Sequence, residues 1–193
     1  MRNVYMANIK GTAKWAKLGV PKDNYDEYQG NGNKNYIIDL YVSDEDLVKF
    51  KSDIAVAYES IGENEKFFKN GKPQEYPKEP MYSPVKTDGD GKEFLRFTTK
   101  AFDDQGEQKT FPLFGADGKP MEKQVGNGSV IQVNYSLQGI RNSAKNAGVK
   151  AYMNAILVNK LVEFGGTGGS AESFGFDVEK PSDQFFGDEE VPI

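Results

Sequence analysis

Apolar and polar residues alternate over residues 2–17, which predicts a β-strand. Its two faces consist of Tyr5, Ala7, Ile9, Ala13 and Trp15 on one side and of Asn8, Lys10, Thr12 and Lys14 on the other. We expect a bend at Gly11, because glycine inside a strand often marks a change of direction. A second strand is predicted at 36–42, YIIDLYV, after a loop rich in Gly, Asn and Asp.

The spacing of apolar residues then changes to three and four, which predicts an amphipathic helix over 44–61. Ser43 is the expected N-cap, since a serine oxygen can accept a hydrogen bond from a free N–H of the first turn. Three acidic residues follow it, where the helix dipole favours negative charge. Gly62 ends the helix.

The rest of the chain favours a mainly β fold with a single inserted helix. Residues 62–91 contain four prolines and the turn sequence TDGDG, so they are predicted to form an irregular connection. Further strands are expected at 92–102, 109–114, 128–140 and 149–164. Five or six strands with one helix between the second and third favour a small antiparallel barrel, and the five-stranded oligonucleotide-binding (OB) fold is the leading candidate.

The third predicted strand alternates aromatic and cationic residues on one face. Leu95, Phe97, Thr99 and Ala101 form an apolar side, whereas Phe94, Arg96, Thr98, Lys100 and Phe102 point the other way. Rings that stack on bases beside cations that follow phosphates are what binding of single-stranded nucleic acid requires. The alternative is that Phe94 and Phe102 pack beneath the 62–91 loop and that the cations are ordinary solvated residues.

Other strands contribute further candidate residues for a nucleic-acid site. The last strand has Lys150 and Tyr152 on the face opposite Val149 and Met153, and the preceding loop supplies Arg141 and Lys145. Trp15 is open to two interpretations, since alternation places it with Ile9 in the core while its position near Lys14 and Lys17 favours exposure. The candidate set is Lys10, Lys14, Trp15, Tyr36, Phe94, Arg96, Lys100, Arg141, Lys145, Lys150 and Tyr152, although Tyr36 fits the core or its rim better.

Composition argues against most enzyme classes. The chain has no cysteine and no histidine, so disulfides, thiolate chemistry, histidine acid–base catalysis and common zinc sites are excluded. We expect no cofactor. No segment is apolar enough to span a membrane and the N-terminus lacks a signal peptide, which predicts a cytoplasmic protein.

Charge is concentrated at the C-terminal end. The net charge is −5, but residues 165–193 carry −6 and residues 1–164 carry +1. We therefore expect a folded domain over 1–164 and a flexible acidic tail over 165–193, rich in Gly and Ser. The tail ends in FFGDEEVPI, and its candidate partner-binding residues are Phe185, Phe186, Asp188, Glu189, Glu190, Val191, Pro192 and Ile193.

Several short motifs, in this order, resemble the single-stranded DNA-binding proteins of podophages. They are GTA at 11–13, the Gly/Asn-rich loop before NYIIDLYV, FLRF at 94–97, DGKPM at 117–121, NYSL at 134–137 and LVEFGG at 161–166, followed by the acidic tail. The resemblance covers nearly the whole chain, and the order and spacing of the motifs carry it.

The resemblance implies a five-stranded OB barrel with an added helix and a groove for single-stranded DNA. Groove residues would be Phe94, Arg96, Lys100, the first strand and the loop after NYSL, where Gly139–Asn142 replace the family's aromatic residues. It also implies a tail that competes with DNA, contacts DNA polymerase, helicase/primase or other replication and recombination proteins, and supports a homodimer. The sequence DEEVPI resembles the terminus of bacterial single-stranded DNA-binding proteins, whose apolar tip fits a partner's pocket.

The function that these features predict is sequence-independent binding of single-stranded DNA in phage replication, recombination and repair. A β-barrel adaptor that binds no DNA and acts through its tail on a host or phage protein is the alternative. A solubilising tail without a partner, and a nuclease with a carboxylate-bound metal, are further alternatives.

Overall fold

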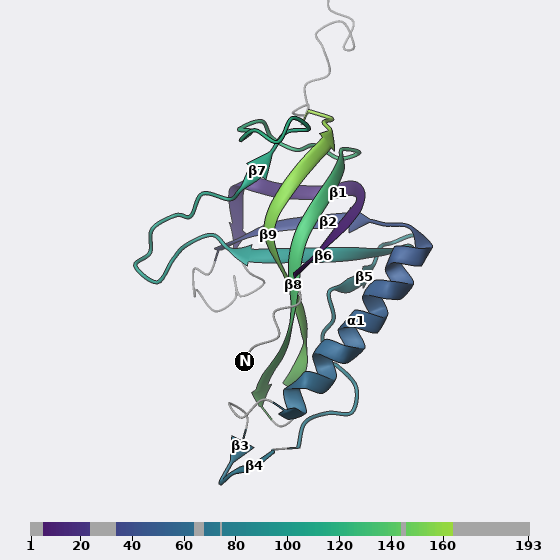
Figure 1. Cartoon of the computed structure of the whole chain (residues 1–193), viewed down its shortest axis with the longest axis vertical. Helices are drawn as coiled ribbons and strands as arrows, with labels where there is room; N and C mark the ends of the chain where they lie inside the picture. Colours follow the sequence, from purple (N-terminus) through teal and green to yellow (C-terminus); the bar gives the residue numbers. More distant parts are fainter. Residues whose placement is uncertain (1–5, 24–33, 64–67, 74, 144–145, 164–193) are drawn as a thin grey trace, which may run out of the picture.

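The computed structural model describes residues 6–23, 34–63, 68–73, 75–143 and 146–163 of the chain. These residues form one helix, α1, and nine strands (Figure 1). Their bounds are β1 Met6–Asp23, β2 Lys34–Tyr41, α1 Asp44–Glu63, β3 Phe68–Lys69, β4 Lys72–Pro73, β5 Val85–Thr87, β6 Glu93–Lys100, β7 Leu113–Phe114, β8 Val130–Ser143 and β9 Asn146–Lys160. The prediction of a mainly β fold with one helix between the second and third major strands is confirmed.

The helix begins as its sequence predicts. Ser43 is the N-cap, because its Oγ accepts a hydrogen bond from the N–H of Asp46 at 3.2 Å. The buried face of α1 packs on the sheet through Phe50, whose ring centroid lies 5.8 Å from that of Phe97 and 5.2 Å from that of Tyr135. Gly139 of β8 lets the helix come close, since a Cβ atom there would lie 2.5 Å from the carbonyl oxygen of Ala57.

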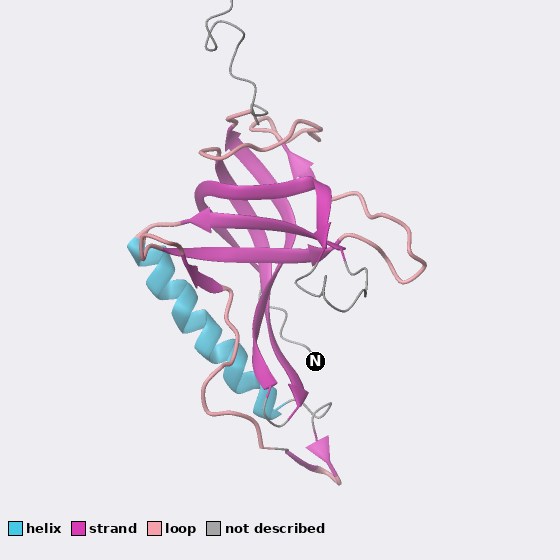
Figure 2. Cartoon of the chain, turned by 180° about the vertical axis from the view of Figure 1, so that it is seen from behind, coloured by secondary structure: helices cyan, strands magenta, loops and turns pink. Residues whose placement is uncertain are grey.

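The main sheet has seven strands in the order β5-β6-β2-β1-β8-β9-β7, more than the sequence predicts. Two of them are short additions: β5 lies in the segment predicted as an irregular loop, and β7 is all that forms of the strand predicted at 109–114. β6 also pairs in parallel with β9, at Thr98 and Tyr152. Seen from behind, the connection from β6 to β7 projects from the sheet as a long loop (Figure 2).

Strand β1 passes from one partner to another near Gly11. Residues 6–12 pair with β8 and residues 12–23 pair with β2, so Thr12 faces both neighbours. A Cβ atom on Gly11 would lie 2.2 Å from the carbonyl oxygen of Tyr41 and 2.8 Å from Cγ of Leu40. Only glycine fits where the strand crosses β2 so closely, as expected for the predicted change of direction.

The segment after NYSL differs from what the resemblance implies. It is not a loop, because β8 continues without interruption to Ser143 and pairs with β9 as far as Ser143 and Asn146. Gly139 and Arg141 therefore belong to a strand, and α1 packs on the first of them. The predicted tail, 165–193, lies outside the described residues, as does Lys145. No helix in the described part of the chain is long and apolar enough to cross a membrane.

Candidate nucleic-acid interface

A β-bulge in β1 decides which side chains reach the outer face of the sheet. Ala13 pairs with Leu40 and Trp15 pairs with Asp39, so Lys14 is an extra residue between two consecutive pairs. A bulge reverses the alternation of side chains beyond it. Ala13 consequently stays buried, whereas the Trp15 residue is 54% exposed on the outer face. The two interpretations of Trp15 are thus decided in favour of exposure.

The outer faces of β1, β2 and β6 border a cavity of about 400 Å³, which we call the groove. Its lining residues are Lys14, Trp15, Lys17, Ile37, Asp39, Thr87, Asp88, Gly89, Phe94 and Arg96. Four of the predicted site residues therefore meet here, although they come from strands about 80 residues apart: Lys14, Trp15, Phe94 and Arg96.

Arg96 is held in place by a buried carboxylate. Its Nε and Nη2 atoms each donate a hydrogen bond of 2.7 Å to the two oxygens of Asp39. The Asp39 side chain is 2% exposed and that of Arg96 is 42% exposed, so the guanidinium closes over the carboxylate while one edge meets solvent. The hydrogen bonding of the guanidinium to the Asp39 carboxylate is the main cause of the raised pKa of Arg96. These two hydrogen bonds fix the orientation of the guanidinium and therefore the direction in which its remaining Nη1 amino group points.

Lys14 is fixed by a second carboxylate, Asp88, in the turn between β5 and β6. Its Nζ lies 2.9 Å from Oδ2 of Asp88, which also accepts a hydrogen bond from the Tyr41 hydroxyl. Oδ1 of Asp88 accepts the N–H groups of Asp90 and Lys92 at 3.0 and 2.9 Å. The hydrogen bonds from Tyr41 and then Lys14 hold the pKa of Asp88 well below its usual range. The TDGDG sequence is therefore a turn whose aspartate orients a groove cation.

Phe94 does not offer a free stacking surface, so this part of the prediction is wrong. The residue is 6% exposed. Lys14 Nζ lies 4.8 Å from its ring centroid, Arg96 Cζ lies 5.7 Å away, and the Tyr41 ring packs edge-on at 6.3 Å. Pairing of β5 with β6 places Lys86 beside Phe94 and encloses the ring further. The alternative, in which Phe94 packs under neighbouring chain, describes it better.

Tyr36 is also buried, as its core or rim interpretation expects. The residue is 3% exposed, and its hydroxyl donates a hydrogen bond of 2.8 Å to the carbonyl oxygen of Lys109.

Lys100, another predicted site residue, is exposed at the end of β6, opposite Asn35.

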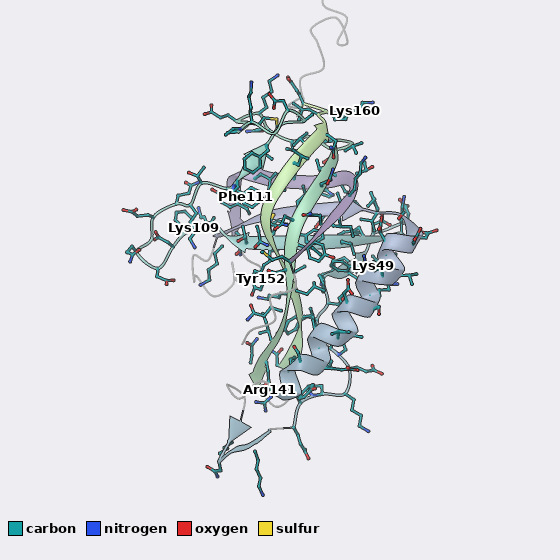
Figure 3. All side chains as sticks on the ribbon, viewed as in Figure 1. Lys49, Lys109, Phe111, Arg141, Tyr152 and Lys160 are labelled. Atoms are coloured by element: carbon teal, nitrogen blue, oxygen red, sulfur yellow. The ribbon has the colours of Figure 1, made fainter. Side chains whose placement is uncertain are left out.

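The remaining candidates lie on other parts of the sheet. Lys10 and Lys150 are exposed on β1 and β9, and Tyr152 is half-buried with its pKa raised by burial. Arg141 lies near the far end of the β8–β9 pair, where its Nη2 donates a hydrogen bond of 2.9 Å to the carbonyl oxygen of Glu75 (Figure 3). The structure therefore does not bring Arg141 to the groove.

Six groove residues were missed by the sequence prediction: Lys17, Ile37, Asp39 and the turn residues Thr87, Asp88 and Gly89. Lys17 lines the groove because the bulge shifts the alternation of β1. Asp39 gave a usable signal, since one acidic residue inside the apolar strand YIIDLYV requires a buried cationic partner. Ile37 gave no sequence signal of a role in the groove, because an apolar residue in a strand is normally assigned to the core.

Comparison with known proteins gives one curated relative, the single-stranded DNA-binding protein of enterobacteria phage T3. It is 30% identical over 187 residues, which cover 86% of this chain and 80% of the relative. No family model matches the chain.

Two solved structures share the fold. The single-stranded DNA-binding protein gp2.5 of bacteriophage T7 is 23% identical with a TM-score of 0.62, covering 86% of this chain and 98% of that chain. The bacteriophage Enc34 protein, solved in complex with single-stranded DNA, is 14% identical with a TM-score of 0.53, covering 83% and 89%. From the identity and coverage of the phage T3 relative, the chain belongs to the family of phage single-stranded DNA-binding proteins.

Proposed function

We propose that the chain binds single-stranded DNA in the groove and that this binding is non-enzymatic and independent of sequence. The observation that carries the proposal is the exposed indole of Trp15 beside Lys14, Lys17 and Arg96 on one sheet face. Proteins that bind single-stranded nucleic acid without sequence preference usually combine rings that stack on any base with cations that bind phosphates. The names of the phage T3 and Enc34 relatives support the same ligand.

In this proposal the carboxylates of Asp39 and Asp88 orient Arg96 and Lys14 for DNA, and each cation keeps the ability to bind a phosphate. Asp39 uses both oxygens on one edge of the guanidinium, which leaves Nη1 of Arg96 for a phosphate oxygen. Asp88 holds Lys14 against the rings of Tyr41 and Phe94. Fixed cations lose less side-chain entropy on binding than free ones do.

We further propose that five strands form an OB barrel, with β5 and β7 as additions at its margins. Strands β6, β2, β1, β8 and β9 pair in that order, and the parallel pair of Thr98 with Tyr152 joins β6 to β9 and closes the ring. In this arrangement the groove lies on the outer wall, where OB folds bind oligonucleotides.

The expected tail activities are also part of the proposal. Residues 165–193 carry a net charge of −6, so their carboxylates can occupy the cationic groove at the high local concentration of a tethered ligand. DNA would displace them and free the tip for a replication or recombination protein. Deletion of 185–193 then tightens DNA binding at low salt and abolishes partner recruitment, whereas unchanged affinity contradicts the competition.

The groove is tested by equilibrium binding of labelled oligothymidine and of a duplex of equal length to the full chain. Binding of the single strand and at least about tenfold weaker binding of the duplex are expected, because only an unpaired base can stack on Trp15. The double substitution R96A/K17A should weaken single-strand binding, with K49A/K119A, which removes two exposed charges outside the groove, as a charge-matched control. Equal affinity for both ligands would refute the proposal, and an adaptor that binds no DNA predicts no change in any variant.

A further inference from the structure

A second cavity lies where strands β6 and β9 separate. Within the described residues their parallel pairing is limited to Thr98 and Tyr152. Beyond that pair the β6–β7 connection enters between the two strands, and the N–H of Ile156 donates a hydrogen bond of 3.0 Å to the carbonyl oxygen of Pro112. The cavity, which we call the seam pocket, has a volume of about 250 Å³ and is bordered by the ends of β2 and β6, by β9 and by residues 109–112.

Residues 109–112 form one wall of the seam pocket, and contacts with Tyr36 hold this wall in place. The Tyr36 hydroxyl donates to the carbonyl oxygen of Lys109 at 2.8 Å and accepts a hydrogen bond from Nε2 of Gln108 at 3.0 Å. The N–H of Lys109 donates to the carbonyl oxygen of Ala101 at 2.7 Å. The Phe111 ring packs on the Tyr36 ring, with centroids 5.8 Å apart and planes at 51°. The pocket is therefore held by buried contacts and not by a chance arrangement of surface loops.

The chemistry of the pocket combines one aromatic ring with two cations. Phe111 is half-buried, so part of its ring faces the cavity, while Lys100 and Lys109 are exposed at the rim. In the described part of the chain neither lysine has an acidic partner. The carboxylate of Asp103 in the same loop is engaged, because it accepts the N–H groups of Gln105 and Glu107 at 2.9 Å each. Figure 3 shows Phe111 and Lys109 on the same side of the molecule, beside β9.

We infer that the seam pocket binds one nucleobase of the DNA strand whose other nucleotides occupy the groove. Base and Phe111 ring would stack, and Lys100 and Lys109 would meet the flanking phosphates. The volume is below the roughly 300–1,000 Å³ typical of pockets for drug-sized ligands, which suits a single flat ring. This inference rests on the proposed function of the groove.

The distance between the two sites fits one continuous strand. Phe94 at the groove and Lys100 at the seam pocket are six residues apart on β6, which corresponds to about 20 Å. Thr98 lies between the two sites, opposite the groove residue Ile37, and neither side chain carries a charge that would repel phosphates. An OB fold contacts about 4 to 16 nucleotides, so a strand could reach both sites.

The test compares F111L with F114L in the full chain, using oligothymidines of about 4 and about 16 nucleotides. Leucine keeps an apolar side chain but removes the ring face, and Phe114 lies in β7, directly after the same connection and outside the pocket. We expect F111L to weaken binding of the longer oligomer by about 5- to 150-fold, the effect of one lost stacking contact, while F114L binds like the wild type. The shorter oligomer, which fits within the groove, should bind all three proteins within about twofold, because its stacking contact is with Trp15.

Photocrosslinking of the wild type gives a second readout that does not depend on a variant's folding. A long oligomer with 5-iododeoxyuridine at each position in turn should crosslink to peptide 109–112 as well as to the Trp15 peptide. Crosslinks at Trp15 without any at 109–112, or equal affinities of F111L and F114L, would overturn the seam pocket and leave the groove standing. Failure of the wild type to bind the longer oligomer would refute the proposed function and this inference together.

Discussion

Trp15 gives the sharpest quantitative prediction, because it is the single tryptophan of the chain and its ring is half exposed in the groove. A tryptophan presents about 150–250 Å² of surface, so roughly 100 Å² is buried here. At about 25 cal/mol per Å² that burial contributes at most about 2.5 kcal/mol to stability. Base stacking on the exposed face should contribute about 1–3 kcal/mol to DNA binding.

The substitutions W15L and W15F separate these two contributions. Leucine retains most of the apolar contact, so the free energy of unfolding should fall by less than about 1.5 kcal/mol, but it has no π-face. W15L should therefore bind oligothymidine about 5- to 150-fold more weakly than the wild type, whereas W15F should keep much of the affinity.

Two assays check the Trp15 prediction. Anisotropy of a labelled oligomer gives the affinities of the variants, and urea unfolding gives their stabilities. In the wild type, stacking should quench the intrinsic fluorescence of Trp15 as DNA is added. Equal affinities of W15L, W15F and wild type, together with unquenched fluorescence at saturation, would refute the stacking role.

Three further predictions concern the residues that support the groove and the helix. R96A should lower the free energy of unfolding by about 2–4 kcal/mol, because it leaves the Asp39 carboxylate buried without its partner, and the double variant D39L/R96M should recover most of the loss in urea unfolding. G139A should cost about 1–3 kcal/mol in the same assay because its Cβ has no room against α1, whereas G89A, with open space around it, serves as the control. The lowered pKa of Asp88 means that its ion pair stabilises the fold at pH values above about 4 and that this contribution is lost as the pH falls toward the depressed pKa. Unfolding of wild type and D88N should thus differ at pH 7 and converge in acid; a constant difference would contradict the assignment.

The elements of the fold were largely predictable because their local signals agree with their final packing. The helix, its Ser43 cap and the major strands follow from periodicity and capping chemistry alone. The short strands β5 and β7 were not predictable, since three or two residues carry no periodic signal and pair only because β6 and β9 are already in place. The alternating pattern correctly predicted a strand as far as residue 140, whereas the resemblance implied a loop over 139–142; Gly139 lies in β8, where α1 packs on it.

The groove was predictable only in part, because contacts between strands decide which side chains line it. Alternation correctly grouped Lys14, Phe94 and Arg96 on outer faces, and the rule fails at the bulge that exposes Trp15. A bulge depends on the pairing partner and so leaves no mark in a single strand's sequence. Burial of Phe94 was one of two interpretations that the sequence left open, because two cations and the neighbouring strand cover the ring only after β1, β5 and β6 come together.

The salt dependence of oligothymidine affinity shows whether the cations of the groove bind the phosphates of single-stranded DNA. The groove offers three cations, Lys14, Lys17 and Arg96, and the seam pocket adds Lys100 and Lys109. Each phosphate neutralised on a single strand contributes about −0.7 to the slope of log K against log salt, so the full chain should give a slope between about −2 and −3.5. The variant R96A/K17A removes two of these cations and should flatten the slope by about 1.4. A slope near zero, or one that this variant leaves unchanged, would contradict binding of single-stranded DNA in the groove.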